Sequence, residues 1–205
     1  MKQILVSLIV LCFIASETKA QSGQYISPRS IGVSFFVNDF QTPQRIRNSS
    51  LTSVIGNKQW AKFRETSPGI AISYHEGIKN HVDFVGTLAG SFVQIDIPNE
   101  DINSDQFLLE ADASFNLKMF PNNFFFTPYI NAGIGLSLYN DKLGGFLPLG
   151  GGLSFNLFNE SKIFINSQYR VPVSTNFNNY HFFHSVGIAG IIGSGRSANN
   201  TVVTP

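Results

Sequence analysis

The strongest constraint on the fold is a strict two-residue alternation along residues 107 to 119. One set of side chains is apolar throughout: Phe107, Leu109, Ala111, Ala113, Phe115, Leu117 and Met119. The intervening set is mostly polar: Leu108, Glu110, Asp112, Ser114, Asn116 and Lys118. Because successive side chains of a β-strand point to opposite faces, this pattern predicts one long strand with an apolar face. A strand that crosses a bilayer needs ~9–11 residues, whereas a typical globular strand has ~5–6.

The same alternation recurs along the chain and predicts eight strands. They cover residues 31–39, 69–78, 81–93, 107–119, 124–138, 146–157, 163–171 and 182–192. The connections are short at 79–80, 121–123 and 159–162, intermediate at 140–145, and longer at 41–66, 97–105 and 173–179. Long strands joined by so few residues pair antiparallel, and the alternation of short and longer connections therefore predicts an up-and-down sheet.

Composition indicates what the apolar faces meet. Charged residues make up 13% of the chain, whereas an ordinary soluble domain has roughly 25%. The faces opposite the apolar ones carry Gly, Ser, Thr, Asn and few charges, which suits a crowded interior. In a bilayer every backbone polar group must be paired, so the sheet has to close. The sequence therefore predicts an all-β fold, an eight-stranded antiparallel up-and-down transmembrane β-barrel, in preference to a soluble lipocalin-like or sandwich fold.

The amino-terminal segment has the layout of a cleavable signal peptide. A basic start at Lys2 precedes an apolar run, and small residues precede the expected cleavage site after Ala20. We therefore expect a signal peptide at 1–20, a periplasmic lead at 21–29, an outer-membrane barrel at 30–192 and a polar tail at 193–205. The only cysteine, Cys12, lies in the leader, so the exported chain would fold without disulfides.

Charge balance argues against a nucleic-acid partner. Removing Lys2, Lys19 and Glu17 from the totals of 14 basic and 13 acidic residues leaves twelve of each. A chain without net charge has no long-range attraction for nucleic acid.

Several of the predicted strands resemble a known family. The segments are SPGIAISYHEGI, HVDFVGTLAGSF, LLEADASFNLKMF, PYINAGIGLSLY, FINSQYRVPV and HFFHSVGIAG. Over most of residues 67–190 they are similar to the amino-terminal barrel of OmpA-like outer-membrane proteins. The resemblance implies a porin-like barrel in a Gram-negative outer membrane and says little about activity. Many members continue into a periplasmic peptidoglycan-binding domain; this sequence ends soon after residue 192, so that domain and its anchoring role are not expected.

Two groups of charged side chains fall on inward positions of the predicted strands. Glu110, Asp112 and Arg170 lie near the outer end, and His75, Asp83 and Lys118 near the periplasmic end. The interior of eight strands is nearly filled by side chains. We therefore expect structural ion-pair networks rather than a gate or a proton path, and no cofactor.

The segment 41–66 is the candidate surface-interaction loop. Polar residues and Pro43 predict an exposed loop. Its cations and its one tryptophan are Arg45, Arg47, Lys58, Trp60, Lys62 and Arg64. The cations suit phosphates of membrane lipids and lipopolysaccharide, and an extracellular ligand is the other partner class that such a loop could bind.

Catalysis and metal binding are not expected. His181, His184 and Ser185 cluster near the outer end of the last strand, but adjacent residues of a strand face opposite sides and no carboxylate is predicted nearby. The acidic residues Asp96, Glu100, Asp101 and Asp105 lack the regular spacing of a calcium loop. The sequence thus predicts a non-enzymatic outer-membrane barrel with a structural role or a surface-interaction role through its loops. The alternative is a lipid-modifying barrel enzyme.

Overall fold

The computed structural model describes residues 26–93, 106–120, 124–157, 161–173 and 180–192. These segments contain the strands β1 (Ser30–Asp39), β2 (Ser67–Lys79), β3 (Val82–Val93), β4 (Gln106–Lys118), β5 (Phe126–Tyr139), β6 (Lys142–Leu157), β7 (Ser161–Pro172) and β8 (His181–Ile191). Between β1 and β2 lie α2 (Gln41–Asn48), α3 (Leu51–Gly56) and a 3-10 helix (Phe63–Glu65). All the predicted strands are present, and apart from the start of β6 their ends lie within two residues of the predicted ones.

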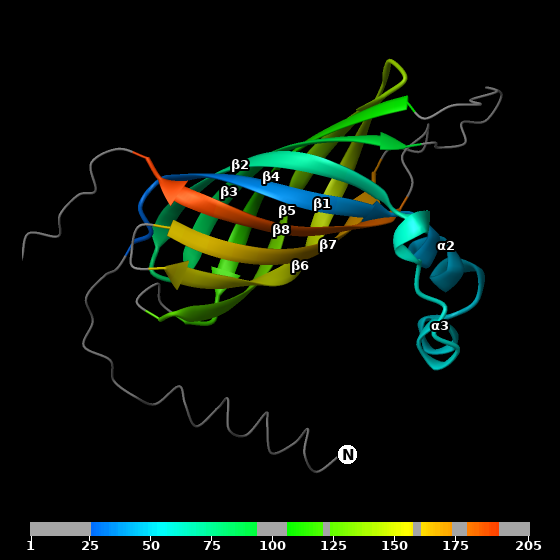
Figure 1. The fold of residues 1–205 in the computed structure, drawn as a ribbon, viewed down its shortest axis with the longest axis horizontal. Helices are drawn as coiled ribbons and strands as arrows, with labels where there is room; N and C mark the ends of the chain where they lie inside the picture. Colours follow the sequence, from blue (N-terminus) through cyan, green and yellow to red (C-terminus); the bar gives the residue numbers. More distant parts are fainter. Residues whose placement is uncertain (1–25, 94–105, 121–123, 158–160, 174–179, 193–205) are drawn as a thin grey trace, which may run out of the picture.

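The strands close into a barrel. Each strand pairs antiparallel with the next, and β8 pairs back with β1, where Gly32 lies opposite Ala189 and Phe36 opposite Ser185. In Figure 1, α2 and α3 lie at one end of the barrel, which we call the helical end. The start of β1 and the end of β8 lie at the opposite end, which we call the terminal end. The predicted eight-stranded antiparallel barrel is confirmed.

The two faces of each strand differ as the alternation predicts. In β2, Ile70 and Ile72 are 66% and 56% exposed, whereas the side chains between and after them, Ala71 and Ser73, are 1% and 4% exposed. In β4 the polar set from Leu108 to Lys118 is buried inside the barrel. The outer surface is therefore mainly an apolar belt around a polar interior, the reverse of a soluble barrel.

The connection between β5 and β6 differs from the prediction. Residues 140–145 were expected to form an intermediate loop, but β6 already begins at Lys142, and only Asn140 and Asp141 separate the strands. Both residues have positive φ, 47° and 59°. A two-residue hairpin turn of the primed type needs this geometry, and Asn and Asp tolerate it better than most residues. The expected loop was wrong because Gly144 and Gly145, taken for loop residues, continue the strand.

Loop 1, which we define as residues 40–66, is more ordered than predicted. It was expected to be an exposed loop without helices, but it contains α2, α3 and the 3-10 helix. Asp39 Oδ1 accepts a hydrogen bond from the Thr42 backbone N–H (2.8 Å), and Ser50 Oγ accepts one from Ser53 N–H (3.1 Å). These side chains satisfy backbone donors that a helix start leaves open, which explains why such short polar helices form. Pro43 lies in the first turn of α2, where proline is tolerated.

Several predictions fall outside the described residues. They are the signal peptide at 1–20, most of the lead at 21–29, the acidic loop at 97–105, the turn at 121–123 and the tail at 193–205. They stay predictions.

Candidate functional site

A buried charged cluster closes the barrel interior at the helical end. The guanidinium of Arg170 in β7 lies between two carboxylates of β4: Nη1 is 2.6 Å from Glu110 Oε2, and Nη2 is 3.2 Å from Asp112 Oδ2. The exposed fractions of Arg170, Glu110 and Asp112 are 0%, 2% and 7%. Glu110 and Asp112 have the same parity on β4, so both point inward and can share one arginine. We call this the arginine cluster.

Neighbouring side chains complete the arginine cluster. Ser137 Oγ donates to Glu110 Oε1 (3.0 Å), and Asn38 Nδ2 donates to Glu110 Oε2 (3.5 Å). The guanidinium carbon of Arg170 lies 3.8 Å from the ring centre of Phe183 and 4.8 Å from that of Phe146. The rings cover the faces of the cation while its edge binds the carboxylates, so the cluster packs the interior at this end.

His181 joins the same cluster, which corrects a prediction. No carboxylate was expected near it, but its Nε2 lies 3.4 Å from Glu110 Oε1. The sequence offered no sign of this contact because β4 and β8 are not neighbours in the sheet. The two side chains meet only across the interior.

A second buried cluster lies at the terminal end. Lys118 Nζ is 2.6 Å from Asp83 Oδ1, with side chains 3% and 6% exposed, and Ser27 Oγ donates to Asp83 Oδ2 (3.4 Å). Lys162 in β7 acts electrostatically on this pair from across the interior. We call Asp83, Lys118 and Lys162 the lysine cluster. Lys162 was missed because residues 159–162 were interpreted as a turn, whereas β7 begins at Ser161.

His75 has other neighbours than those predicted. It was expected to converge with Asp83 and Lys118, but its Nε2 lies 2.9 Å from Ser73 Oγ on the same strand, and its ring packs against Phe164 at 5.2 Å between centres. These neighbours place His75 on the wall of a cavity that lies closer to the helical end.

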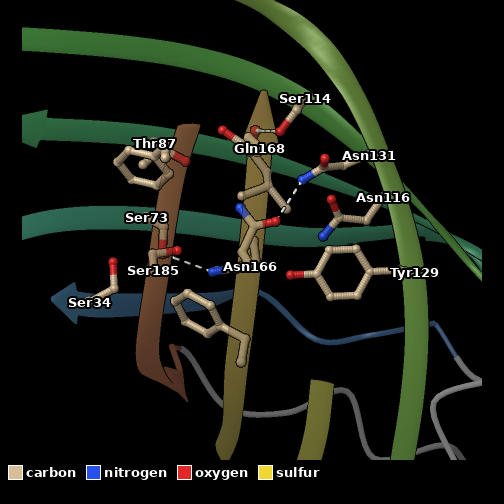
Figure 2. Close-up of a pocket in the computed structure, with 14 residues that line it drawn as sticks. Ser34, Ser73, Thr87, Ser114, Asn116, Tyr129, Asn131, Asn166, Gln168 and Ser185 are labelled. Carbon is tan, nitrogen blue, oxygen red and sulfur yellow. Dashed lines mark hydrogen bonds between the residues drawn. The ribbon is translucent and has the colours of Figure 1, made fainter. Parts of the chain in front are cut away.

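That cavity lies between the two charged clusters and is lined almost entirely by uncharged side chains. The empty volume of the cavity together with its opening is ≈ 360 Å³. Figure 2 shows Asn116, Tyr129 and Asn131 pointing across it toward Asn166 and Gln168. Asn131 Nδ2 donates to Asn166 Oδ1 (3.1 Å).

Gly152 leaves room for the Tyr129 ring on one side of the cavity. Several polar atoms of the cavity wall also lack a hydrogen-bond partner in the part of the chain that the structure describes. A Cβ on Gly152 would collide with the Ile165 carbonyl oxygen and the Tyr129 ring. His75 Nδ1, Asn116 Oδ1 and Asn131 Oδ1 are buried without a hydrogen-bond partner among the described residues. Buried polar atoms without protein partners are typically hydrogen-bonded to water, so this cavity is suited to ordered water.

Loop 1 folds onto itself around Arg45. Its Nη2 is 3.0 Å from Glu65 Oε2, and its Nη1 donates to the Gln59 carbonyl (3.3 Å). The backbone N–H of Lys62 also donates to Glu65 (2.9 Å), and this hydrogen bond together with Arg45 lowers the pKa of the Glu65 carboxyl. Arg45 thus holds the loop together.

The other predicted loop residues point outward. Arg47, Lys58, Lys62 and Arg64 are exposed, and Trp60 is 49% exposed. Arg47 lies over the ring of Tyr180 at 4.3 Å, beside the start of β8. Four cations and an aromatic ring are therefore presented to the surroundings at the helical end.

The residues of the enzymatic alternative are separated by the sheet. Ser185 is 6% exposed and lines the interior cavity, whereas His184 is exposed on the outer face. Another serine takes the expected place: Ser167 Oγ in β7 lies 2.9 Å from His184 Nδ1. Ser167 was missed because a pair across two strands requires their register, and the residues connecting β7 and β8 do not reveal it.

The described segments lack two classes of feature. They contain no group of three or more His, Cys, Asp or Glu residues that could hold a metal ion. None of their helices is long and apolar enough to cross a membrane.

Comparison with known proteins identifies the fold. No protein-family model and no curated protein matches the sequence. Among solved structures, Neisserial surface protein A (NspA) is similar with a TM-score of 0.52 and 14% identity, over 83% of this chain and 100% of that one. The outer membrane protein OprG from Pseudomonas aeruginosa gives 0.55 and 10%, over 83% and 98%. The chain therefore has the fold of eight-stranded outer-membrane β-barrels, the fold that the resemblance to OmpA-like barrels implied.

Proposed function

We propose that this chain is a non-enzymatic barrel of the bacterial outer membrane that binds anionic surface ligands through loop 1. The observation that carries the proposal is the contrast at the helical end. There the interior is filled by the arginine cluster, while loop 1 presents exposed cations around Trp60. A barrel whose interior is filled and whose loop 1 is cationic is suited to binding molecules at its surface rather than to transporting them.

The apolar belt supports a position in the outer membrane. Large apolar side chains are 46–68% exposed around the barrel, among them Ile31, Ile70, Leu88, Leu117, Ile134 and Ile188. Water would destabilise such a surface, and hydrocarbon stabilises it. A closed sheet also pairs the backbone polar groups of its strands, as a bilayer requires. The start of β1 and the end of β8 then lie in the periplasm, with α2 and α3 outside.

Charge supports an anionic partner. Loop 1 carries five basic residues and one acidic residue, Glu65, which is paired with Arg45. Arg45 is thereby used within the loop, and the remaining cations are open to phosphate or sulfate groups. Lipopolysaccharide, other membrane lipids and extracellular polyanions all offer such groups.

The test is adhesion of intact cells that express the chain. Cells are applied to surfaces coated with dextran sulfate or with uncharged dextran, which share a backbone. We expect retention on dextran sulfate only, decreasing with added salt because surface charges are screened. A Lys58→Ala/Lys62→Ala/Arg64→Ala variant should lose this retention on dextran sulfate. Equal retention of the variant, or equal retention on the two surfaces, would contradict the proposal.

A second candidate function, lipid-ester cleavage, rests on the Ser167–His184 pair. A serine hydroxyl within hydrogen-bond reach of a histidine can attack an ester carbonyl while the imidazole takes its proton; the alcohol leaves, and water then releases the acyl group. The site faces the membrane, where lipid esters are found.

Mass spectrometry of membrane lipids tests this second candidate. Cells expressing the chain would contain deacylated lipids, and cells expressing Ser167→Ala or His184→Ala would not. Ser185→Ala is the matched control, since Ser185 faces the interior. Identical lipid profiles in all four strains would exclude the esterase and leave the first proposal standing.

A further inference from the structure

The outer face of β7 and β8 interrupts the apolar belt near the helical end. Elsewhere in the helical half, neighbouring outward pairs are apolar, such as Phe92 with Phe107 on β3 and β4. On β7 and β8 the outward pairs are Tyr169 with Phe182 and, one step deeper, Ser167 with His184. A hydrogen-bonding pair inside the belt is unfavourable against hydrocarbon alone.

These side chains form a continuous stack, which we call the β7–β8 ladder. Ring centres of Tyr180 and Tyr169 are 5.8 Å apart, those of Tyr169 and Phe182 5.1 Å, and those of Phe182 and His184 5.6 Å. Above the stack, Arg47 covers Tyr180 at 4.3 Å. The ladder thus begins with a cation and ends with an imidazole and a hydroxyl.

The helices of loop 1 hold the cation in place. Arg47 lies in the last turn of α2, and α2 packs against β8. The side chain of Arg47 is exposed, so its donors can reach a ligand while its plane rests on Tyr180. A guanidinium on an aromatic ring is a preorganised phosphate-binding group, because less side-chain freedom is lost on binding.

Polarity along the ladder matches one kind of molecule. Below Ser167 and His184, the outward pairs on the same strands are Ile165 with Val186 and Ile163 with Ile188. From the helical end inward the surface therefore changes from cationic to aromatic, then to hydrogen-bonding, then to purely aliphatic. An aromatic girdle alone needs neither the cation nor the hydrogen-bonding pair.

We propose that the β7–β8 ladder binds an outer-leaflet lipid whose head group is a phosphorylated sugar, the lipid A part of lipopolysaccharide. Arg47 binds the phosphate, the tyrosine and phenylalanine rings pack against the sugar rings, and Ser167 with His184 bonds hydroxyl or ester groups at the start of the acyl chains. The isoleucines and Val186 below contact those chains. The proposal rests on the outer-membrane location proposed above, and it assigns lipid binding to the barrel wall rather than to the Lys58–Arg64 part of loop 1.

Native mass spectrometry of the purified full chain tests the site. The protein is incubated in detergent with lipid A, with phosphatidylglycerol or with phosphatidylcholine, and retained lipid is quantified over a concentration series. We expect lipid A to bind most tightly, because phosphatidylglycerol offers the phosphate without the sugars. Arg47→Ala and Tyr180→Ala should each weaken lipid A binding roughly tenfold, the size expected for one lost contact to a charged group.

Matched controls separate the ladder from general effects. Phe107→Ala removes an aromatic ring from the helical end of another strand pair, and Lys79→Ala removes an exposed cation at the terminal end. Both should bind lipid A within about twofold of the unaltered chain. Each variant is first shown to be folded by its different gel migration before and after boiling, as closed barrels show. Equal losses in ladder and control variants, or equal binding of lipid A and phosphatidylglycerol, would overturn the proposal.

The adhesion assay distinguishes this proposal from the proposed function. If Arg47→Ala loses lipid A but cells still adhere to dextran sulfate, both proposals stand as separate properties. If the Lys58→Ala/Lys62→Ala/Arg64→Ala variant keeps both adhesion and lipid A binding, the ladder stands and the surface-ligand proposal fails.

Discussion

The arginine cluster and the lysine cluster fill the two ends of the same interior with opposite excess charge. At the helical end one guanidinium faces two carboxylates, Glu110 and Asp112. At the terminal end one carboxylate, Asp83, faces Lys118 directly and Lys162 through space. The directly paired charges of both clusters are buried, and the uncharged cavity lies between the clusters.

The difference shows that the cost of removing a buried charge depends on what is left behind. Arginine presents a fixed fork of donors that can serve two carboxylates at once, whereas each lysine is a point charge. The arginine cluster therefore depends on Arg170 alone. In the lysine cluster, Lys162 can partly compensate the charge of Asp83 when Lys118 is removed. The predictions below test this asymmetry.

The largest effect is expected from Arg170→Met. Methionine fills similar space but leaves two buried carboxylates without their cation, so we expect a loss of unfolding free energy of about 3–5 kcal/mol or more. Reversible urea unfolding from lipid vesicles measures it, with Arg64→Met, an exposed loop position, as the near-neutral control. A loss below ~1 kcal/mol would mean that Arg170 is not the common partner of the two carboxylates.

Asp83→Ala and Lys118→Ala should have unequal costs. Removing Asp83 leaves the buried ammonium of Lys118 without its carboxylate and is expected to cost about 3–5 kcal/mol. Removing Lys118 leaves Asp83 with Lys162 nearby and should cost less. The double variant should cost less than the Asp83→Ala variant, since both charges of the direct pair are gone.

A double-mutant cycle checks the contact itself. Because the two groups are 2.6 Å apart, the two single changes should deviate from additivity by more than ~0.5 kcal/mol. Strict additivity would show that the side chains do not meet, and equal single costs would show that Lys162 gives no compensation.

An exposed ion pair provides a smaller effect for comparison with the buried ones. The pKa of Glu65 is lowered from its ordinary value of 4.5 by the Lys62 backbone N–H and by Arg45. A lowered folded-state pKa means that the pair stabilises loop 1 above pH 4.5 and that this stabilisation is lost as the pH falls through the folded value. Fluorescence of Trp60, the only tryptophan, should report a shallow acid transition. The same transition in Glu65→Gln would rule out Glu65 as its cause.

The barrel is not expected to conduct ions. Arg170, Phe36, Phe146 and Phe183 are at most 2% exposed and fill the interior on the helical side of the cavity. Purified chain in planar bilayers is therefore expected to give no stable single-channel steps. Large, regular steps would show that the two clusters do not close the barrel.

Much of the fold could be predicted because parity along a strand is a local property. The alternation in 107–119 indicated which face of β4 is buried, and the antiparallel pairing of consecutive strands placed Asp83 in β3 and Lys118 in β4 at the same end of the barrel. The contacts of His181 with Glu110 and of Ser167 with His184 could not be predicted, because each depends on register or on distance across a closed sheet. The helices of loop 1 were missed because they are short and polar. The side chains of Asp39 and Ser50, which accept backbone hydrogen bonds at the helix starts, support them in place of an apolar period.

Cysteine labelling of intact cells tests the central claim, a barrel inserted with loop 1 outside, most directly. The sequence has one cysteine, in the expected leader, so single cysteines can be introduced without background. Gly56→Cys lies at the end of α3, where an added Cβ meets no atom within 4 Å, and Lys79→Cys lies at the opposite end of the barrel. With a membrane-impermeant maleimide, Gly56→Cys should react in intact cells and Lys79→Cys only after the membrane is broken. Labelling of Lys79→Cys in intact cells, or protection of Gly56→Cys, would contradict the account.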